Sequence, residues 1–385
     1  MLLAHKVELR PTPEQAEYLA RACGSRRHCY NQLLAHFKQD GVTWSKAAAY
    51  QHYIQVVRPA FPWYCEVSSR VTRNAIDDLD SAFRHFFRRV KLGEKPGFPV
   101  FKKKGIGDSF ALREKPKFSV DGRELRIEKL KTPIAMRQEL RFAGTLNRVT
   151  ISQRAGKFYA SVLVETEDYN PHDQQKEAVG VDFGIKHLAV FSDGTEISAN
   201  DALKRNLNAL KRKQRRLSRK QKGSHRRANA KLAVAKLHKR ITDQRQAALH
   251  ELSNKLTREY KVVCIEDLNV KGMVKNDKLA RSISDAGFGT LRRMIEYKAE
   301  LRGVTVAVVG RFEPTSRTCC DCGQIHDMPL SKRVMECDCG NVMDRDLNAA
   351  RNILARGLDT LGPDLKRTQE SCKTAGSPGA TALTA

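Results

Sequence analysis

The chain has 385 residues, of which 70 are lysine or arginine and 43 are acidic, so that its formal net charge is +27. This length predicts two or three domains, and the positive charge predicts a polyanionic partner. Hydrophobic residues make up 41% of the sequence, which excludes wholesale disorder. The longest apolar runs are far shorter than the roughly 20 residues that span a bilayer, and the first residues contain no apolar core of a signal peptide. We therefore expect a cytoplasmic protein with no membrane partner.

The N-terminal region is predicted to form one strand followed by helices. The strand covers 3–9. Thr12 and Pro13 then have the order of residues that starts a helix, which we expect to continue from 14 to about 38. A second helix begins near Ser68, and its apolar residues recur at steps of three and four, so that one face is predicted to be buried.

A proline- and glycine-containing segment at 95–99 ends the helical region, and short strands follow it. The pairs 118–120 with 125–127 and 149–152 with 158–164 each flank a turn sequence and predict two hairpins. We expect a small antiparallel sheet or barrel, which the strand at 3–9 can join. The polar segment 165–176 is predicted to be a linker.

The second half of the chain has a mixed α/β pattern. Strands are predicted at 179–182, 188–191, 262–266 and 305–309, with a long helical region from about 201 to 260 and further helical stretches between and after the later strands. The residues at the C-terminal end, 362–385, are expected to be disordered.

The helical region between Lys204 and Arg245 is strongly basic, with 17 lysines and arginines against one acid, Asp243. A charged face exposed only to solvent is the simpler interpretation. Like charges four residues apart destabilise a helix, however, and a bound polyanion would relieve that repulsion. We therefore expect nucleic acid to bind here. The predicted contacts are Arg212, Arg215, Arg216 and Arg219.

Five cysteines lie within a short segment, where they indicate a metal site rather than a disulfide framework. Cys319 and Cys322 form a C-x2-C pair, and Cys337 and Cys339 form a C-x-C pair 14 residues further on. A glycine follows each pair and lets the chain fold back. Four thiolates are predicted to hold a structural Zn²⁺. Because the second pair is one residue short, Cys320 or His326 remains an alternative ligand.

Three acids occupy positions that suggest a catalytic site. Asp182 and Glu266 each end an apolar strand, and Asp346 lies at the start of a helix just beyond the cysteines. Acids at strand ends converge at the carboxyl edge of an open α/β sheet. Three carboxylates would suit two Mg²⁺ ions, for which Mn²⁺ can substitute, in phosphodiester hydrolysis. Asp344 is predicted to cap the helix, and His187 is predicted to have a structural role.

At these residues the sequence strongly resembles the TnpB (OrfB) family of insertion-sequence proteins, which are relatives of the type V CRISPR effectors. The resemblance covers about residues 6–354. The motifs that carry it are GVDFGIKHLAVFSDG (180–194), IEDLNVKGM (265–273), SISDAGFG (282–289), TSRTCCDCG (315–323), DRDLNAARNI (344–353), YNQLL (30–34), DLDSAFRHFFRR (78–89) and GFPVFKKK (97–104).

The resemblance implies an α/β RNase H-like (RuvC-type) nuclease domain with an inserted zinc ribbon, and an N-terminal antiparallel β-barrel that carries an inserted α-helical bundle. The expected domains are a wedge-like barrel (1–10 and 105–172), a helical recognition domain (11–104), the nuclease domain (177–311 and 341–361), the zinc ribbon as a module that binds target nucleic acid (312–340) and a disordered tail (362–385). It also maps the family's catalytic acids onto Asp182, Glu266 and Asp346.

Family membership implies an RNA-guided DNA endonuclease of a prokaryotic transposable element. The expected partners are a guide RNA from the element end and double-stranded target DNA next to a short protein-read motif. The protein is expected to be monomeric and to associate with the nucleoid when it is bound to DNA. The N-terminal candidates for nucleic-acid contact are Tyr30, Asn31, Phe86, Lys102 and Lys103. For Phe86, core packing is an equally good interpretation.

Three alternative functions stay open at this point. The first is a catalytically silent RNA-guided regulator, against which the three intact acids argue. The second is a transposase that recognises element ends without RNA. The third is a zinc-ribbon RNA-binding protein, which would leave the three acids unexplained.

Overall fold

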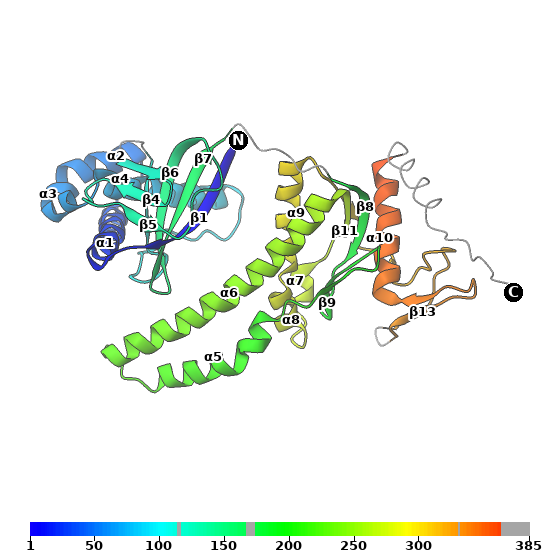
Figure 1. Ribbon diagram of the computed structural model, residues 1–385. Helices are drawn as coiled ribbons and strands as arrows, with labels where there is room; N and C mark the ends of the chain where they lie inside the picture. Colours follow the sequence, from blue (N-terminus) through cyan, green and yellow to red (C-terminus); the bar gives the residue numbers. More distant parts are fainter. Residues whose placement is uncertain (114–116, 167–173, 330–331, 363–385) are drawn as a thin grey trace. The chain divides into compact units, whose positions relative to one another are not determined.

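A computed structural model describes residues 1–113, 117–166, 174–329 and 332–362. The chain divides into two compact units, Met1–Tyr169 and Asn170–Ala385, and each is described here by itself (Figure 1). Within the described ranges, no helix is both long and apolar enough to cross a membrane. Most of the predicted linker and all but the first residue of the predicted disordered tail lie outside the described residues.

The first unit is built on a seven-stranded antiparallel sheet in the order β2-β6-β7-β1-β5-β4-β3. The sheet forms a nearly closed barrel. It is not fully closed, because the edge strands β2 and β3 do not pair with each other. The predicted strand at 3–9 and both predicted hairpins are confirmed. The strands are β1 (Leu2–Arg10), β2 (Ser109–Leu112), β3 (Phe118–Asp121), β4 (Glu124–Ile127), β5 (Ile134–Met136), β6 (Thr145–Arg154) and β7 (Lys157–Glu165).

Helical elements occupy the chain between β1 and β2. They are α1 (Pro13–His36), α2 (Lys46–His52), the π-helix η1 (Tyr53–Val57), α3 (Arg58–Ala60), the 3-10 helix η2 (Pro62–Glu66) and α4 (Ser69–Lys91). As predicted, Thr12 caps α1: its hydroxyl accepts a hydrogen bond from the Gln15 backbone N–H, and its own backbone N–H donates one to the Gln15 side-chain oxygen. The predicted apolar stripe of α4 is buried from Val71 to Phe83, whereas Phe87 and Val90 are exposed.

The second unit contains a five-stranded sheet in the order β10-β9-β8-β11-β12. β8, β11 and β12 are parallel to one another, and β9 and β10 are antiparallel additions. All four strands that the sequence predicts are present, and β10 is an unpredicted fifth. Their bounds are β8 (Lys176–Asp182), β9 (His187–Phe191), β10 (Glu196–Ser198), β11 (Tyr260–Glu266) and β12 (Thr305–Val309).

Helices cover both faces of this sheet. α10 (Arg345–Leu361) packs on one face, and α6 (His225–Glu259), α8 (Ala280–Ala286) and α9 (Phe288–Arg302) pack on the other (Figure 1). The sequence predicts one long helical region from 201 to 260, but the structure breaks it into α5 (Ala202–Ser218) and α6. Gly223 lies in the break, four residues after the C-cap of α5, with a φ of +88°, a conformation that favours glycine and lets the chain reverse before α6 begins.

Two short segments complete the second unit. The helix α7 (Val270–Met273) follows β11, and the strands β13 (Val334–Glu336) and β14 (Val342–Asp344) form a separate two-stranded ladder between β12 and α10. The cysteine cluster belongs to this second segment, so that the cysteines are inserted between the last strand of the large sheet and its last helix.

Candidate functional site

Two of the three predicted acids lie side by side at the carboxyl end of the large sheet. Asp182 ends β8 and Glu266 ends β11. The parallel register pairs Val181 with Ile265, so the next residues of the two strands occupy neighbouring positions. Adjacent strands are about 4.8 Å apart. The backbone positions that carry the two carboxylates are therefore close neighbours at the edge of the sheet.

Both acids project from the face of the sheet that α10 covers. Side chains alternate between the two faces of a strand, so Asp182 shares its face with Ala178, and Glu266 shares its face with Cys264. Ala178 and Cys264 pack in the core cluster that also contains Ile353 of α10.

The helix α10 brings the third acid to the same face. It begins at Arg345, and the Asp344 carboxylate accepts a hydrogen bond from the Asp346 backbone N–H at 2.8 Å, which confirms the predicted cap. The helix touches the sheet at Gly180, where an added Cβ would lie 2.1 Å from the Ala350 carbonyl oxygen. Asp346 lies one turn before that contact and Asp182 lies two residues beyond it. Each of these steps covers about 6 Å.

The electrostatics of Asp182 reflect this convergence. Burial raises the pKa of Asp182 to about 8, and the negative charges of Glu266 and Asp346 add to the effect, while Arg345 opposes it. The folded chain thus concentrates acidic groups without enough positive charge to balance them. The structure brings the three predicted acids together.

The acids converge less tightly than the cysteines do. In the part of the chain that the structure describes, the four cysteines are the one group of three or more potential ligands whose donor atoms all lie within 4.8 Å of one another. Within the acidic group, Glu266 has a direct partner, since the Thr315 hydroxyl donates a hydrogen bond to its Oε1. Thr315 is a site residue that sequence reasoning missed.

Three basic residues near this group, Arg292, Arg311 and His187, lie against carboxylates outside it. Arg292 and Arg311 each donate to the Asp267 carboxylate at 2.6 Å, and their hydrogen bonds lower the pKa of Asp267. His187 Nδ1 lies 3.3 Å from Glu196 Oε2. Val190 pairs with Asp182, and His187 is three residues away on the same strand, so its side chain lies on the opposite face.

The second cluster consists of Cys319, Cys322, Cys337 and Cys339, whose sulfur atoms lie within 4.8 Å of one another. Each predicted pair is followed by a glycine with positive φ, as expected for a chain that folds back around a ligand pair. These are Gly323 at +79° and Gly340 at +91°.

The structure separates the candidates left open by the short second pair into those inside and those outside the cluster. Cys320 and His326 lie outside the group of four. The Cys320 sulfur instead lies 3.7 Å from Met343 Sδ, and burial raises the pKa of its thiol. Both cysteines of the C-x-C pair therefore belong to the cluster.

Two buried asparagines of α10 connect the acidic group to the cysteine segment. The Asn348 side chain donates to the Thr318 carbonyl oxygen at 2.7 Å and accepts from the Cys320 backbone N–H at 3.0 Å. The Asn352 amide donates to the carbonyl oxygens of Thr315 and Thr318. Their spacing of four residues in a helix interior is the sequence signal that could have revealed them, because a buried amide needs polar partners.

Most of the N-terminal candidates for nucleic-acid contact make contacts within the first unit, and Lys103 is exposed. Tyr30 is 4% exposed, and the Lys102 ammonium lies 4.0 Å from the centre of its ring. Asn31 exchanges two hydrogen bonds with the Lys102 backbone, at 2.8 and 3.0 Å, so that the side chain of Asn31 serves to hold the 97–104 segment. Phe86 is half-buried against Phe98, whereas Lys103 is exposed.

The four candidate arginines of the basic region are exposed, three of them on α5 and Arg219 at its C-cap. Among the described residues, no ion pair engages Arg212, Arg215, Arg216 or Arg219. The apolar side of α5 packs on α6 through Leu210, Leu237 and Ile241. The hairpin of α5 and α6 therefore presents its arginines to solvent.

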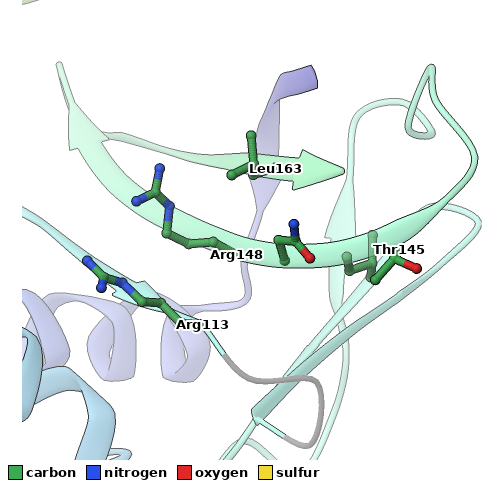
Figure 2. Close-up of a pocket in the computed structure, with 6 residues that line it drawn as sticks. Arg113, Thr145, Arg148 and Leu163 are labelled. Atoms are coloured by element: carbon green, nitrogen blue, oxygen red, sulfur yellow. The ribbon is translucent and has the colours of Figure 1, made fainter. Parts of the chain in front are cut away.

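A groove of about 550 Å³ on the first unit contains residues that sequence reasoning missed (Figure 2). It follows the start of β6, where the ladder shifts register between Leu146 and Arg148. Arg113 and Arg148 line it, and Figure 2 shows their side chains extending in the same direction. No sequence signal marks this pair, because its proximity depends on strand register.

Family models match three parts of the chain. A model named OrfB_IS605, described as a probable transposase, matches residues 161–277, and a Cas12f1-like TNB domain matches residues 288–353. A model described as a helix-turn-helix domain matches residues 1–40, where the structure has the strand β1 and the single helix α1.

Similar proteins cover nearly the whole chain. A putative RNA-guided DNA endonuclease of Streptomyces pristinaespiralis is 37% identical over 96% of this chain and 94% of its own length. The putative RNA-guided DNA endonuclease InsQ of Escherichia coli is 30% identical, with 92% of each chain covered. A Cas12f1–sgRNA–target DNA complex, solved by cryo-electron microscopy, shares the fold with a TM-score of 0.55 at 16% identity, over 89% of this chain and 83% of that one. The chain belongs to the TnpB (OrfB) family of insertion-sequence proteins.

Proposed function

We propose that this protein is an RNA-guided DNA endonuclease of a transposable element, and that Asp182, Glu266 and Asp346 are its catalytic residues. The observation that carries the proposal is the convergence of these acids on one sheet face, where burial, together with the charges of Glu266 and Asp346, raises the pKa of Asp182. Relatives of similar length that are named as putative RNA-guided DNA endonucleases support the same activity.

The second unit, in this proposal, is a RuvC-type nuclease domain with an RNase H-like fold. Its strand order and its α10 helix across the parallel strands support this assignment. The cysteine segment is then a zinc ribbon inserted into the nuclease domain. The first unit corresponds to a barrel with a helical bundle inserted between β1 and β2.

The acidic site fits a hard divalent cation such as Mg²⁺, with Mn²⁺ as a substitute. Carboxylate oxygens are the donors that Mg²⁺ prefers, and the excess of negative charge around Asp182 requires a cation for all three acids to ionise together. Two such ions, when bound, supply an activated water and neutralise charge on the scissile phosphate. The protein's own part is to hold the acids on rigid elements, with Thr315 orienting Glu266 through its hydroxyl.

The four clustered cysteines fit a structural Zn²⁺. Hydrogen bonds, chiefly from Asn341, outweigh burial and lower the pKa of Cys319 to about 6, which favours a thiolate. We expect one zinc per chain by elemental analysis. Cys339→Ser should release it, and Cys320→Ser should retain it, because Cys320 lies outside the cluster. Equal zinc content in both variants would contradict this ligand set.

The nucleic-acid partners in this proposal are a guide RNA and double-stranded target DNA, bound by a monomeric protein in the prokaryotic cytoplasm. The exposed arginines of α5 are the contacts to which we assign most of the backbone binding, and Arg113 and Arg148 of the groove add a second cationic pair. Lys103 remains a candidate, whereas the burial of Tyr30 limits it to positioning its neighbours.

A guided plasmid-cleavage assay tests the function. RNA that copurifies with the protein is sequenced, and a plasmid that carries the matching target is incubated with the complex and Mg²⁺. We expect cleavage, and we expect Asp182→Ala to reduce it by at least about 1,000-fold without weakening RNA binding. Excess EDTA should also stop it. Cleavage that persists in Asp182→Ala would contradict the assigned site.

The same experiment separates the two rival functions. A silent regulator would bind the target under guide control and leave the plasmid intact in every condition. A transposase, which the description of the OrfB_IS605 model favours, would bind element-end DNA after RNase treatment had removed any copurified RNA. RNase treatment should instead abolish target binding if the protein is RNA-guided.

A further inference from the structure

Phe312 is an unusually exposed aromatic residue beside the acidic site. Its side chain is 94% exposed, whereas no other described phenylalanine, tyrosine or tryptophan exceeds 50%. It lies in the short loop that follows β12 and precedes the cysteine segment. Burial of a phenylalanine stabilises a fold by about 1.5–3 kcal/mol, so an almost fully exposed one contributes nothing of this kind to the free chain.

The loop that carries Phe312 is held on both sides. Before it, Arg311 donates to the Asp267 carboxylate at 2.6 Å and to the Asp267 carbonyl oxygen at 3.3 Å. After it, the Glu313 backbone N–H bonds to the Gly310 carbonyl oxygen at 3.1 Å, which closes a turn with Phe312 inside it. Phe312 is therefore the exposed tip of an anchored turn.

The same turn is tied to the proposed catalytic acids. β12 pairs with β11 up to Val309 and Glu266, so the turn begins at the sheet edge where Glu266 ends. Three residues after Phe312, the Thr315 hydroxyl donates to the Glu266 carboxylate. Three residues span at most about 11 Å, so the backbone at Phe312 lies within about 11 Å of the Thr315 backbone, whose side chain contacts Glu266.

We propose that Phe312 stacks on a nucleobase of the DNA strand that enters the acidic site, and so positions the scissile phosphate against Asp182, Glu266 and Asp346. This inference rests on the proposed nuclease function of that site. An aromatic face stacks on any base, so the contact tolerates every sequence, as a protein whose specificity comes from base pairing requires. A ring held by an anchored turn also loses little entropy when the base arrives.

Three substitutions separate stacking from simple apolar contact. Phe312→Ala removes the ring, Phe312→Leu keeps an apolar side chain without an aromatic face, and Phe312→Trp keeps the face. Each is made in the full chain with its guide RNA and combined with Asp182→Asn to prevent cutting. The probe is a single-stranded DNA with 2-aminopurine at successive positions, whose fluorescence falls when the base stacks on an aromatic ring.

We expect quenching at one or two adjacent positions when the ring of Phe312 is present or replaced by tryptophan, and none for Phe312→Ala or Phe312→Leu. The Kd for the single strand should rise about 5- to 100-fold in Phe312→Ala. In the background with Asp182 intact, the cleavage rate should fall for alanine and leucine and recover for tryptophan. Unchanged quenching and unchanged Kd in Phe312→Ala would overturn the stacking proposal.

The two proposals fail in distinguishable ways. If the chain with its native Phe312 and Asp182 does not cut a guided target but quenching depends on Phe312, the nuclease assignment fails and the stacking contact stands. If that chain cuts, and Phe312→Ala cuts equally fast with the same quenching, the nuclease assignment stands and Phe312 has no positioning role.

Discussion

At the scale of a single residue, Asp182 of the candidate site lowers the free energy of unfolding of the protein when its carboxyl group is ionised. Burial and two neighbouring carboxylates raise its pKa to about 8 in the folded chain, from an ordinary value of 3.8. Between these two values the folded protein binds more protons than the unfolded chain, so stability falls as pH rises through this window. Strongly perturbed carboxyl groups are common at functional sites, which agrees with the role proposed for Asp182.

We predict that Asp182→Asn stabilises the protein at alkaline pH. Without added divalent metal, its free energy of unfolding should exceed that of the unsubstituted chain by about 2 kcal/mol at pH 8.5, after allowance for solvent screening of a partly exposed carboxyl. Near pH 4 the difference should disappear, because Asp182 is then protonated in the folded state. Urea unfolding at several pH values measures this.

A matched control for this prediction is Asp193→Asn. Burial raises the pKa of Asp193, but hydrogen bonds from Thr195 and Tyr260 outweigh it and lower the pKa overall. That carboxylate stabilises the fold above its unfolded pKa and loses its contribution as pH falls. Asp193→Asn should therefore destabilise the protein at neutral pH, and a stabilising effect there would contradict the reasoning applied to both residues.

At the scale of the element, the position of α10 depends on two glycines, one in the sheet and one in the helix. An added Cβ at Gly180 would meet the Ala350 carbonyl oxygen at 2.1 Å, and one at Gly357 would meet the Cys264 sulfur at 2.5 Å. Such distances leave no room for a methyl group, so the helix approaches the strands as closely as backbones allow. This close approach brings Asp346, at the start of the helix, near Asp182, at the end of β8.

We predict that Gly180→Ala forces α10 away from β8. The expected cost is about 3 kcal/mol of stability, in the range of overpacked cores, together with loss of guided cleavage. Gly289→Ala is the control, since Gly289 lies within α9 and a Cβ there would meet nothing within 4 Å. Thermal unfolding and the plasmid assay measure both effects. Normal cleavage by a folded Gly180→Ala chain would show that Asp346 does not need this contact.

The α5–α6 hairpin is a second element with a separable role. Replacement of Arg212, Arg215, Arg216 and Arg219 by alanine should weaken RNA binding and reduce the slope of log Kd against log salt by roughly three to four. Replacement of the same four residues by lysine keeps the charge and should keep most of the slope. Filter binding over a series of salt concentrations measures it. An unchanged slope in the alanine variant would mean that these arginines are exposed to solvent only.

At the scale of the whole molecule, the two compact units have separate cores. In the first unit, one cluster includes Leu9 and Ile151 and another includes Leu79 and Phe83. In the second unit, the two sides of the large sheet have their own clusters, which include Val263 and Cys264 respectively. Separate cores are expected to unfold as separate cooperative transitions.

We predict two calorimetric transitions for the free protein. Leu79→Ala removes a fully buried side chain and should lower only the first unit's transition, by about 2–5 kcal/mol. Gly180→Ala should lower only the second unit's transition. A single transition that shifts as a whole with either substitution would show that the two units unfold as one.

Much of this fold is predictable from local sequence patterns. The helix α1 has a capping residue and a proline at its start, α4 has a clear apolar period, and the hairpins around 121–122 and 155–156 have turn sequences. The strands β2, β5, β10, β13 and β14 were missed, because segments of three or four residues are too short to show a period. The break between α5 and α6 was missed because a single glycine does not by itself reveal a chain reversal.

The sequence alone determined the family of this protein and most of its candidate site residues. It identified the family, the three acids, the four cysteines and the basic helical region, because each is a matter of residue type and spacing along the chain. It left open whether Cys320 or His326 replaced a cysteine of the short pair, and it left Thr315, Asn348, Asn352 and Phe312 unnoticed.

Only the tertiary structure decided which residues meet. The register of β8 with β11 sets Asp182 beside Glu266, and the close packing of α10 brings in Asp346. The folded cysteine segment likewise selects four sulfur atoms and excludes Cys320. The physical reason is that these contacts join positions up to about 160 residues apart, and their geometry depends on backbone register and side-chain volume, which a pattern along one chain does not encode.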